Sequence, residues 1–125
     1  MISPSFRVKF FNCILKDISF TASEAYSLAF HNCQLNTISF SKTELTNLIF
    51  RNCQLMNCSF GSSVSYCVHY LNCQLKSVKF NATDLTNFKL ENSQLVDVSF
   101  SGSEVDNLTI KDSTLKNIDF NQMTV

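Results

Sequence analysis

The feature that most constrains the fold of this chain is a repeat of twenty residues, itself divided into units of five. The run Leu-x-Phe-x-Asn-Cys-Gln-Leu-x-x-hydrophobic-x-Phe occurs over residues 28–40 and again over residues 48–60. In rows of twenty, one column holds leucine and the column five residues later holds phenylalanine. These core columns are Leu15, Leu35, Leu55, Leu75, Leu95 and Leu115, and Phe20, Phe40, Phe60, Phe80, Phe100 and Phe120. A short repeat buries its apolar side only against neighbouring repeats, so the pattern predicts a solenoid.

A second set of apolar or small residues lies two positions before each column, as Cys33 precedes Leu35 and Ile38 precedes Phe40. Positions two apart share one face of an extended chain. Each five-residue unit therefore offers two inward side chains and then turns, and four units close a square coil. The sequence predicts an all-β solenoid of about six coils as a single domain over 1–125, with a lead-in over 1–7 and repeats over 8–125.

One polar column indicates where the chain turns. It comprises Asn12, Asn32, Asn52, Asn72 and Asn92, with Asp112 in the last row. Asparagine tolerates a positive φ angle, and the chain has only two glycines and one proline to form its corners. We therefore interpret this column as a structural corner rather than as a ligand site.

The five-residue pattern resembles that of the pentapeptide-repeat proteins, whose fold is a right-handed quadrilateral β-helix, and the resemblance covers nearly the whole chain. The chain departs from the family at the small inward position, where Cys, Ser, Thr, Ile, Val or Leu stands in place of Ala. A leucine-rich-repeat solenoid is the alternative, because residues 45–55 also fit that template. That fold needs one strand and a looser convex side in each repeat, whereas here the five-residue period persists through every quarter of each row.

Composition narrows the classes of function and location. Ten acidic and ten basic residues give a formal net charge of zero, so neither direct nucleic-acid binding nor a strongly acidic surface is indicated. The first residues lack a charged start followed by a long apolar run, and no run is long enough to span a bilayer. With six cysteines and no such signal, we expect reduced thiols, a cytoplasmic location and no association with membranes.

The row from Gly61 to Leu71 is irregular and is a possible binding patch or bulge. Ser65 stands where a large residue is expected, and Tyr66, Cys67 and His69 gather nearby. A Cys and a His two residues apart suggest nucleophilic catalysis, but no third partner or oxyanion hole is visible. Cysteines lack the spacing of a zinc site. We therefore expect no catalytic residue, no cofactor and no metal, and expect Cys67 to be the solvent-facing thiol.

The expected function is that of a non-enzymatic structural or protein-interaction module with an unknown partner. The resemblance implies an alternative, since some family members imitate DNA, bind DNA gyrase or topoisomerase and confer resistance to quinolones or toxins. Such mimicry requires closely spaced negative charge. Here the lysines and arginines are spread among the acidic residues along the sequence, which argues against the alternative.

The last row predicts self-association. The apolar column positions continue through Ile110, Leu115, Phe120 and Val125 without a segment that would cap the final coil. A bare coil exposes apolar side chains and unpaired backbone groups, a combination that favours pairing with another chain. We expect a homodimer formed through the C-terminal coil, with the two rods end to end about a two-fold axis.

Overall fold

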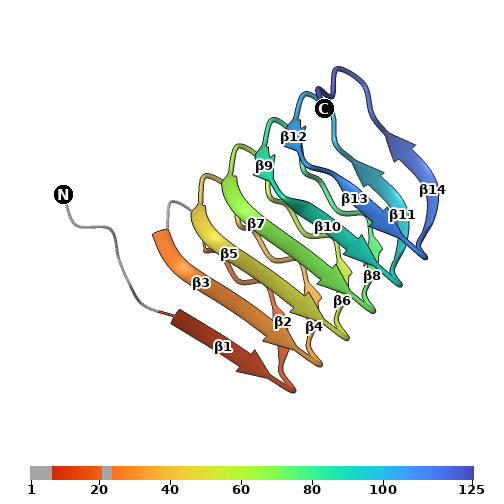
Figure 1. Ribbon diagram of the computed structural model, residues 1–125. Coiled ribbons are helices and arrows are strands. Elements are labelled where there is room, and N and C mark those ends of the chain that lie inside the picture. The colour runs from red at the N-terminus through yellow and green to blue at the C-terminus, as the bar shows by residue number, and fades with distance from the viewer. Residues whose placement is uncertain (1–6, 21–23) are drawn as a thin grey trace.

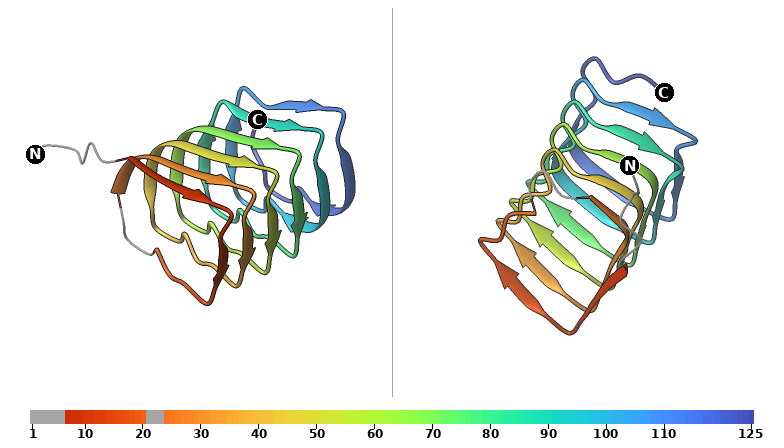
Figure 2. Two further views of the ribbon diagram at one scale, coloured as in Figure 1. Left: turned by 90° about the horizontal axis from the view of Figure 1, so that it is seen from below. Right: turned by 90° about the vertical axis from the view of Figure 1, so that its left-hand side faces the viewer.

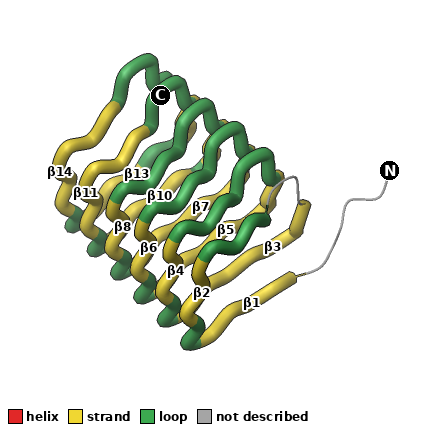
Figure 3. The backbone as a smooth tube through the Cα atoms, turned by 180° about the vertical axis from the view of Figure 1, so that it is seen from behind, coloured by secondary structure: helices red, strands yellow, loops and turns green. Residues whose placement is uncertain are grey.

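The chain folds into a parallel β-solenoid of about five turns, as the computed structural model shows for residues 7–20 and 24–125 (Figure 1). Strands make up the regular structure of this part of the chain, and no helix occurs in it (Figure 3). The described residues therefore include no helix that could cross a membrane. The first strand begins at Arg7, so the expected lead-in lies almost entirely outside the described residues.

Two parallel sheets form two sides of the solenoid, and each coil contributes to both (Figure 2). The longer strands of the first sheet are β1 (Arg7–Phe11), β3 (Glu24–His31), β5 (Glu44–Arg51), β7 (Val64–Leu71), β10 (Phe88–Glu91) and β13 (Thr109–Lys111). The short strands β9 (Asp84–Thr86) and β12 (Glu104–Asp106) extend it from β7. The second sheet comprises β2 (Ile14–Lys16), β4 (Gln34–Asn36), β6 (Gln54–Met56), β8 (Gln74–Lys76), β11 (Gln94–Ser99) and β14 (Thr114–Asp119).

The register of these sheets follows the sequence repeat. Leu28 pairs with Leu48, and Leu35 pairs with Leu55, so that each residue lies beside the one twenty positions later. A third side consists mainly of turns with isolated bridges, such as Ser39 to Ser59 (Figure 3). A leucine-rich repeat would carry a single sheet on the inside of an arc. The two sheets and the bridged side therefore confirm the predicted β-helix.

The corners are formed by residues with positive φ angles. Asn52 has φ 54° and Asn72 has φ 54°, as expected for the asparagine column. A second corner column lies five residues later and includes Asn57 (φ 56°) and Asp97 (φ 56°). At each corner the amide joins the next coil, as when Asn52 N donates to Leu71 O at 2.9 Å. Asparagine and aspartate adopt this conformation at low cost, which explains a coiled chain that is poor in glycine.

The predicted four-sided coil is confirmed, but its fourth corner does not take the same form in every row. β3, β5 and β7 each continue through it as one strand of eight residues, and in β7 two successive residues, Tyr66 and Cys67, face outward where the strand bends. In the next two rows Asn87 (φ 53°) and Asn107 (φ 56°) interrupt the strand. Asn47 stays extended because it is paired between Ser27 and Cys67. Parallel pairing favours the same backbone path in neighbouring coils. The rows of β3, β5 and β7 therefore share one form of this corner, and the rows of Asn87 and Asn107 share another.

The core is filled by stacked aromatic rings. Phe60 lies 4.7 Å from Phe40 and 4.9 Å from Phe80, measured between ring centroids. A second stack runs beside it, in which Phe50 and Tyr70 are 4.7 Å apart. Rings of the two stacks meet edge to face, as Phe50 and Phe60 do at 90°. Both geometries are favourable for aromatic pairs, so each ring is held by neighbours within and between the stacks.

Burial of the predicted core columns depends on their place along the rod. The leucine column is buried from Leu35 to Leu95, and the phenylalanine column from Phe40 to Phe100. Leu15 and Phe20 in the first coil are partly buried. Leu115 and Phe120 in the last coil are exposed by 40% and 44%. Both still continue the core columns, Leu115 beside Leu95 and Phe120 stacked on Phe100, but they are not buried, because an end coil is covered on one side only.

Candidate interaction surfaces

The C-terminal coil presents an open apolar end. Ile110 of β13 and Leu115 of β14 are exposed, as are Phe120 and Val125. A depression with an entirely apolar lining opens between Ile110, Leu115 and Phe120, and its wall includes Leu108 and Met123. Among the described residues, β13 pairs only with β10 and β14 only with β11. The outer edges of both strands thus leave backbone donors and acceptors beside exposed apolar side chains.

The three residues of the irregular row do not form one site. The Tyr66 hydroxyl donates to Glu44 Oε1 at 3.5 Å, and Asn87 Nδ2 donates to the exposed Cys67 Sγ at 3.9 Å. His69 instead approaches Glu91, with 3.7 Å between Nε2 and Oε1. Each of these three side chains therefore has a different neighbour, and Cys67 and His69 do not contact one another as a catalytic pair would.

The predicted bulge in this row is also absent from the described strands. Ser65 pairs in register with Leu45 and Leu85, so no residue is inserted. Ser65 is buried despite its small size. Phe88 is buried in the next row, against Tyr70, so that large side chains in neighbouring coils fill the core around the serine.

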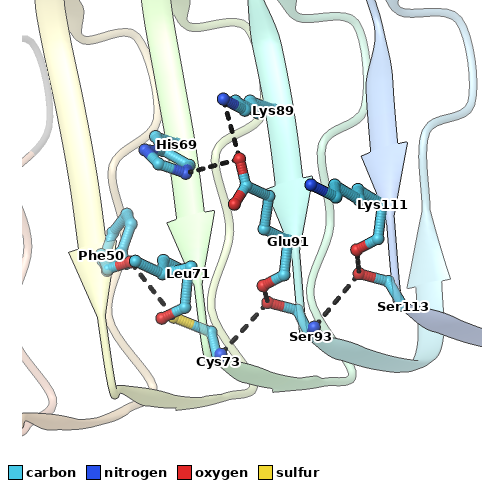
Figure 4. A network of polar contacts seen from close by, with 9 residues as sticks. All are labelled: Phe50, His69, Leu71, Cys73, Lys89, Glu91, Ser93, Lys111 and Ser113. Carbon is cyan, nitrogen blue, oxygen red and sulfur yellow. Dashed lines mark hydrogen bonds and ion pairs between the residues drawn. The ribbon is translucent and has the colours of Figure 1, made fainter.

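A polar network joins the outer side of β7 and β10 (Figure 4). Lys89 Nζ lies 2.8 Å from Glu91 Oε1, and this hydrogen bond lowers the pKa of Glu91. Burial lowers the pKa of His69, while Glu91 opposes that change. At neutral pH His69 is therefore uncharged, and the network consists of one ion pair with a neutral imidazole beside it.

Serines continue the cysteine column by a different hydrogen bond (Figure 4). Cys73 Sγ donates to Phe50 O at 3.3 Å, which links it to an earlier coil. Ser93 Oγ accepts from Cys73 N at 3.1 Å and donates to Glu91 O at 2.8 Å. Ser113 accepts from Ser93 N in the same way. These contacts join successive coils, so the column has a structural role.

The cysteines form no disulfide in the structure. Cys33, Cys53, Cys58 and Cys73 are buried, Cys13 is partly buried and Cys67 is exposed. Burial raises the pKa of the Cys33 and Cys58 thiols, and the contact with Cys53, together with burial, raises that of Cys73. Residues 7–20 and 24–125 contain no group of three or more potential ligands that could hold a metal ion.

Charges that alternate along the sequence are separated by the fold. Five exposed carboxylates lie on strand segments at one side of the solenoid, and we call them the acidic face: Glu24, Glu44, Asp84, Glu104 and Asp106. The outer surface of the long strands instead carries Lys9, Arg51, Lys89 and Lys111, with Glu91 among them. On these two surfaces the signs are largely separated, because residues twenty positions apart fall into one column. The second sheet still carries both signs, with Lys76 and Lys116 near Asp97.

The acidic face includes a groove with a volume of about 480 Å³. Tyr66 and Val64 lie at one side, and Asp84, Glu104 and Asp106 also line it. Within residues 7–20 and 24–125, none of the five carboxylates of the acidic face lies within 4 Å of a lysine or arginine nitrogen. Asp84 and Glu104 are paired neighbours in the sheet, where like charges destabilise one another. Sequence reasoning missed this groove, although the twenty-residue spacing of the acids was a usable signal.

These features define a class: a parallel β-solenoid of five-residue units, with polar faces and one open apolar end. No protein-family model matches the chain, and no curated protein is similar to it. Its fold is that of the pentapeptide-repeat β-helix. A solved structure of a trypsin-treated variant of QnrB1, described as a plasmid-mediated fluoroquinolone resistance protein, aligns with a TM-score of 0.53 and 14% identity.

That alignment covers 96% of this chain and 85% of the QnrB1 chain. The pentapeptide-repeat protein Rfr23 from the cyanobacterium Cyanothece 51142 is 13% identical, with a TM-score of 0.42 over 93% of this chain and 90% of its own. At such low identity the likeness to QnrB1 concerns the fold alone.

Proposed function

We propose that this protein is a non-enzymatic protein-interaction module that assembles through its C-terminal coil. The observation that carries the proposal is the open end, where Ile110, Leu115 and Phe120 are exposed beside the unpaired edges of β13 and β14. Burying this apolar surface is favourable, at roughly 25 cal/mol per Å². Strand edges next to it supply backbone hydrogen bonds to an added strand. We place the module in the cytoplasm, where free thiols are stable.

The simplest occupant of the open end is a second copy of the chain. A two-fold arrangement brings identical end coils together and closes the assembly as a dimer. In this arrangement Phe120 and Leu115 of one copy cover the same apolar depression in the other. The acidic face lies along the side of the rod, and its groove extends to Thr124 and Val125 at the C-terminal end.

Phe120→Asp is expected to convert the dimer into a monomer, because it places a charge in the apolar contact. Val125→Asp is expected to act in the same direction. Multi-angle light scattering at tens of micromolar measures the mass, and circular dichroism checks that the variants remain folded. Gln94→Asp is the matched control, since Gln94 is exposed on β11 at the side of the rod, in the coil before the last, and does not line the apolar depression. Unmodified protein that is already monomeric under these conditions would contradict the proposed assembly.

A second candidate function is binding to DNA gyrase or another topoisomerase. Two observations favour it: the fold is shared with QnrB1, and the acidic face repeats carboxylates at the coil spacing of about 4.8 Å. The net charge of zero and the basic outer surface of the long strands place it second.

If the second candidate is right, the protein will inhibit gyrase supercoiling or protect the enzyme from a quinolone at low micromolar concentration. The variant Asp84→Asn with Glu104→Gln should lose this effect, because it removes two neighbouring negative charges while preserving the size of the side chains. The control variant, Asp97→Asn with Asp119→Asn, also removes two negative charges, but from the second sheet, on β11 and β14. Supercoiling that is unaffected at tens of micromolar protein would exclude this candidate.

A further inference from the structure

One aromatic ring of the acidic face already holds a cation from the chain itself. The guanidinium of Arg7 lies over the ring of Tyr26, with Cζ 4.8 Å from the ring centroid. Tyr26 stands two residues after Glu24, in the column beside the acids. An arginine over a tyrosine face is attracted by the ring and adds roughly 0.5–1 kcal/mol at an exposed site. The solenoid thus shows, within one chain, how this surface binds an arginine.

Tyr66 occupies the equivalent position two rows later but lacks the cation. Arg7 precedes Tyr26 by nineteen residues, and Asn47 precedes Tyr66 by the same interval. Asn47 is in the same column as Arg7, through the pairings of Arg7 with Ser27 and of Ser27 with Asn47. The ring of Tyr66 is 46% exposed. Its surface is therefore free to take an arginine from another molecule.

The surroundings of Tyr66 supply the matching negative charge. The groove beside the ring is lined by Asp84, Glu104 and Asp106, and its volume of about 480 Å³ accommodates a long side chain. Glu44 approaches from the preceding coil through its contact with the Tyr66 hydroxyl. A cation in the groove relieves the repulsion between the paired carboxylates of Asp84 and Glu104.

We propose that the groove beside Tyr66 is a docking site for an arginine-containing basic segment of a partner protein. This inference rests on the proposed interaction function and names the chemistry of the partner. The guanidinium stacks on Tyr66, and its N–H groups donate to the carboxylates of the groove. Basic residues on either side meet the remaining acids along the rod, spaced by the coil repeat of about 4.8 Å.

Arginine fits the groove better than lysine does. The guanidinium is planar, lies flat on an aromatic ring and presents several donors in fixed directions, so it engages a ring and a carboxylate together. A lysine ammonium is a compact, strongly hydrated charge and makes one of these contacts at a time. The site therefore distinguishes the two side chains, which a diffuse acidic surface would not do.

The experiment measures binding of a fluorescein-labelled peptide with alternating glycine and arginine to the full chain by fluorescence anisotropy. The same peptide with lysine in place of arginine is the comparison. We expect the arginine peptide to bind about three-fold or more tightly than the lysine peptide, as the cation–π contribution implies. Affinity for both peptides should fall as salt is raised, because the surface charges are screened.

Variants of the groove separate ring stacking from charge. Tyr66→Ala should weaken the arginine peptide by about three-fold or more and remove the preference over lysine, whereas Tyr66→Phe, which keeps the ring, should retain that preference. Asp84→Asn with Glu104→Gln should weaken both peptides, and Asp97→Asn with Asp119→Asn should weaken them less. Equal affinity for the two peptides, an unchanged preference in Tyr66→Ala, or no binding at low salt would each overturn the proposal.

The test also separates this inference from the proposed assembly. Tyr66 lies away from β13 and β14, so the mass of Tyr66→Ala by light scattering should equal that of the unmodified protein. Peptide binding by a monomeric protein would leave the groove proposal standing and contradict the dimer. A dimer that shows no preference for the arginine peptide would support the proposed assembly and contradict the groove proposal.

Discussion

Replacing Phe60 with alanine is expected to lower the free energy of unfolding by about 3–5 kcal/mol. Phe60 is 2% exposed and stacks between Phe40 and Phe80, with Phe50 at its edge. Truncation removes the transfer free energy of the ring and leaves a cavity between coils that their fixed spacing prevents from closing. Urea unfolding followed by far-ultraviolet circular dichroism measures the change.

The matched control for this prediction is Phe11→Ala. Phe11 also stacks on a ring, His31, but on the outside of the rod, where it is 57% exposed. Its loss should cost less than about 1 kcal/mol, as is usual for a surface position. Equal costs at Phe60 and Phe11 would mean that the aromatic column does not form the core.

Tyr70→Phe is expected to raise the free energy of unfolding by about 1–2 kcal/mol, because it removes a buried hydroxyl that has no partner. The Tyr70 hydroxyl is fully buried and makes no hydrogen bond in the structure. The ring stacks on Phe50, and the stack continues through Phe30 to Phe10. Phenylalanine keeps this stacking and removes the cost of desolvating the hydroxyl. Urea unfolding of the two proteins at neutral pH gives the difference.

The effect of pH provides a second measurement at Tyr70. Burial raises its pKa well above the ordinary value of 10.0. The folded protein therefore keeps the phenol protonated above pH 10, while the unfolded chain releases the proton. Because only the unfolded chain releases this proton, the free energy of unfolding is unaffected below pH 10 and falls as pH rises beyond it. The advantage of Tyr70→Phe should therefore grow above pH 10.

Tyr66→Phe is the control for both measurements at Tyr70. Tyr66 is exposed, so removing its hydroxyl should change stability by less than about 0.5 kcal/mol. A destabilising effect of Tyr70→Phe would show that the hydroxyl has a partner, such as an internal water, and would contradict the prediction.

Most of the fold could be predicted from the sequence because the same constraint recurs in every row. A single inward phenylalanine carries little information, but Phe40, Phe60 and Phe80 at equal spacing require coils that stack in register. The corner asparagines could be predicted for the same reason, since Asn52 and Asn72 repeat a conformation that few residues adopt readily. Periodicity thus determines the strands, the turns and the inward columns together.

The surfaces could be predicted only in part. The exposed end was anticipated from Leu115 and Phe120, because the pattern continues to the last row. Tyr66, Cys67 and His69 do not form one site together, since their partners Glu44, Asn87 and Glu91 come from neighbouring coils. The acids Glu24, Glu44, Asp84 and Glu104 recur at one position of the sequence repeat, but the groove beside them appears only in the folded chain.

By itself, the sequence determined a solenoid with a coil of twenty residues, an aromatic core and asparagine corners, because each inward position is repeated and local. The tertiary structure decided the path of the fourth corner, the separation of acidic from basic faces and the groove beside Tyr66. These features depend on which residues become neighbours across coils. Parallel pairing places residues twenty positions apart side by side. Neighbouring coils then share a backbone path, and their outward charges add into a surface that no single row contains.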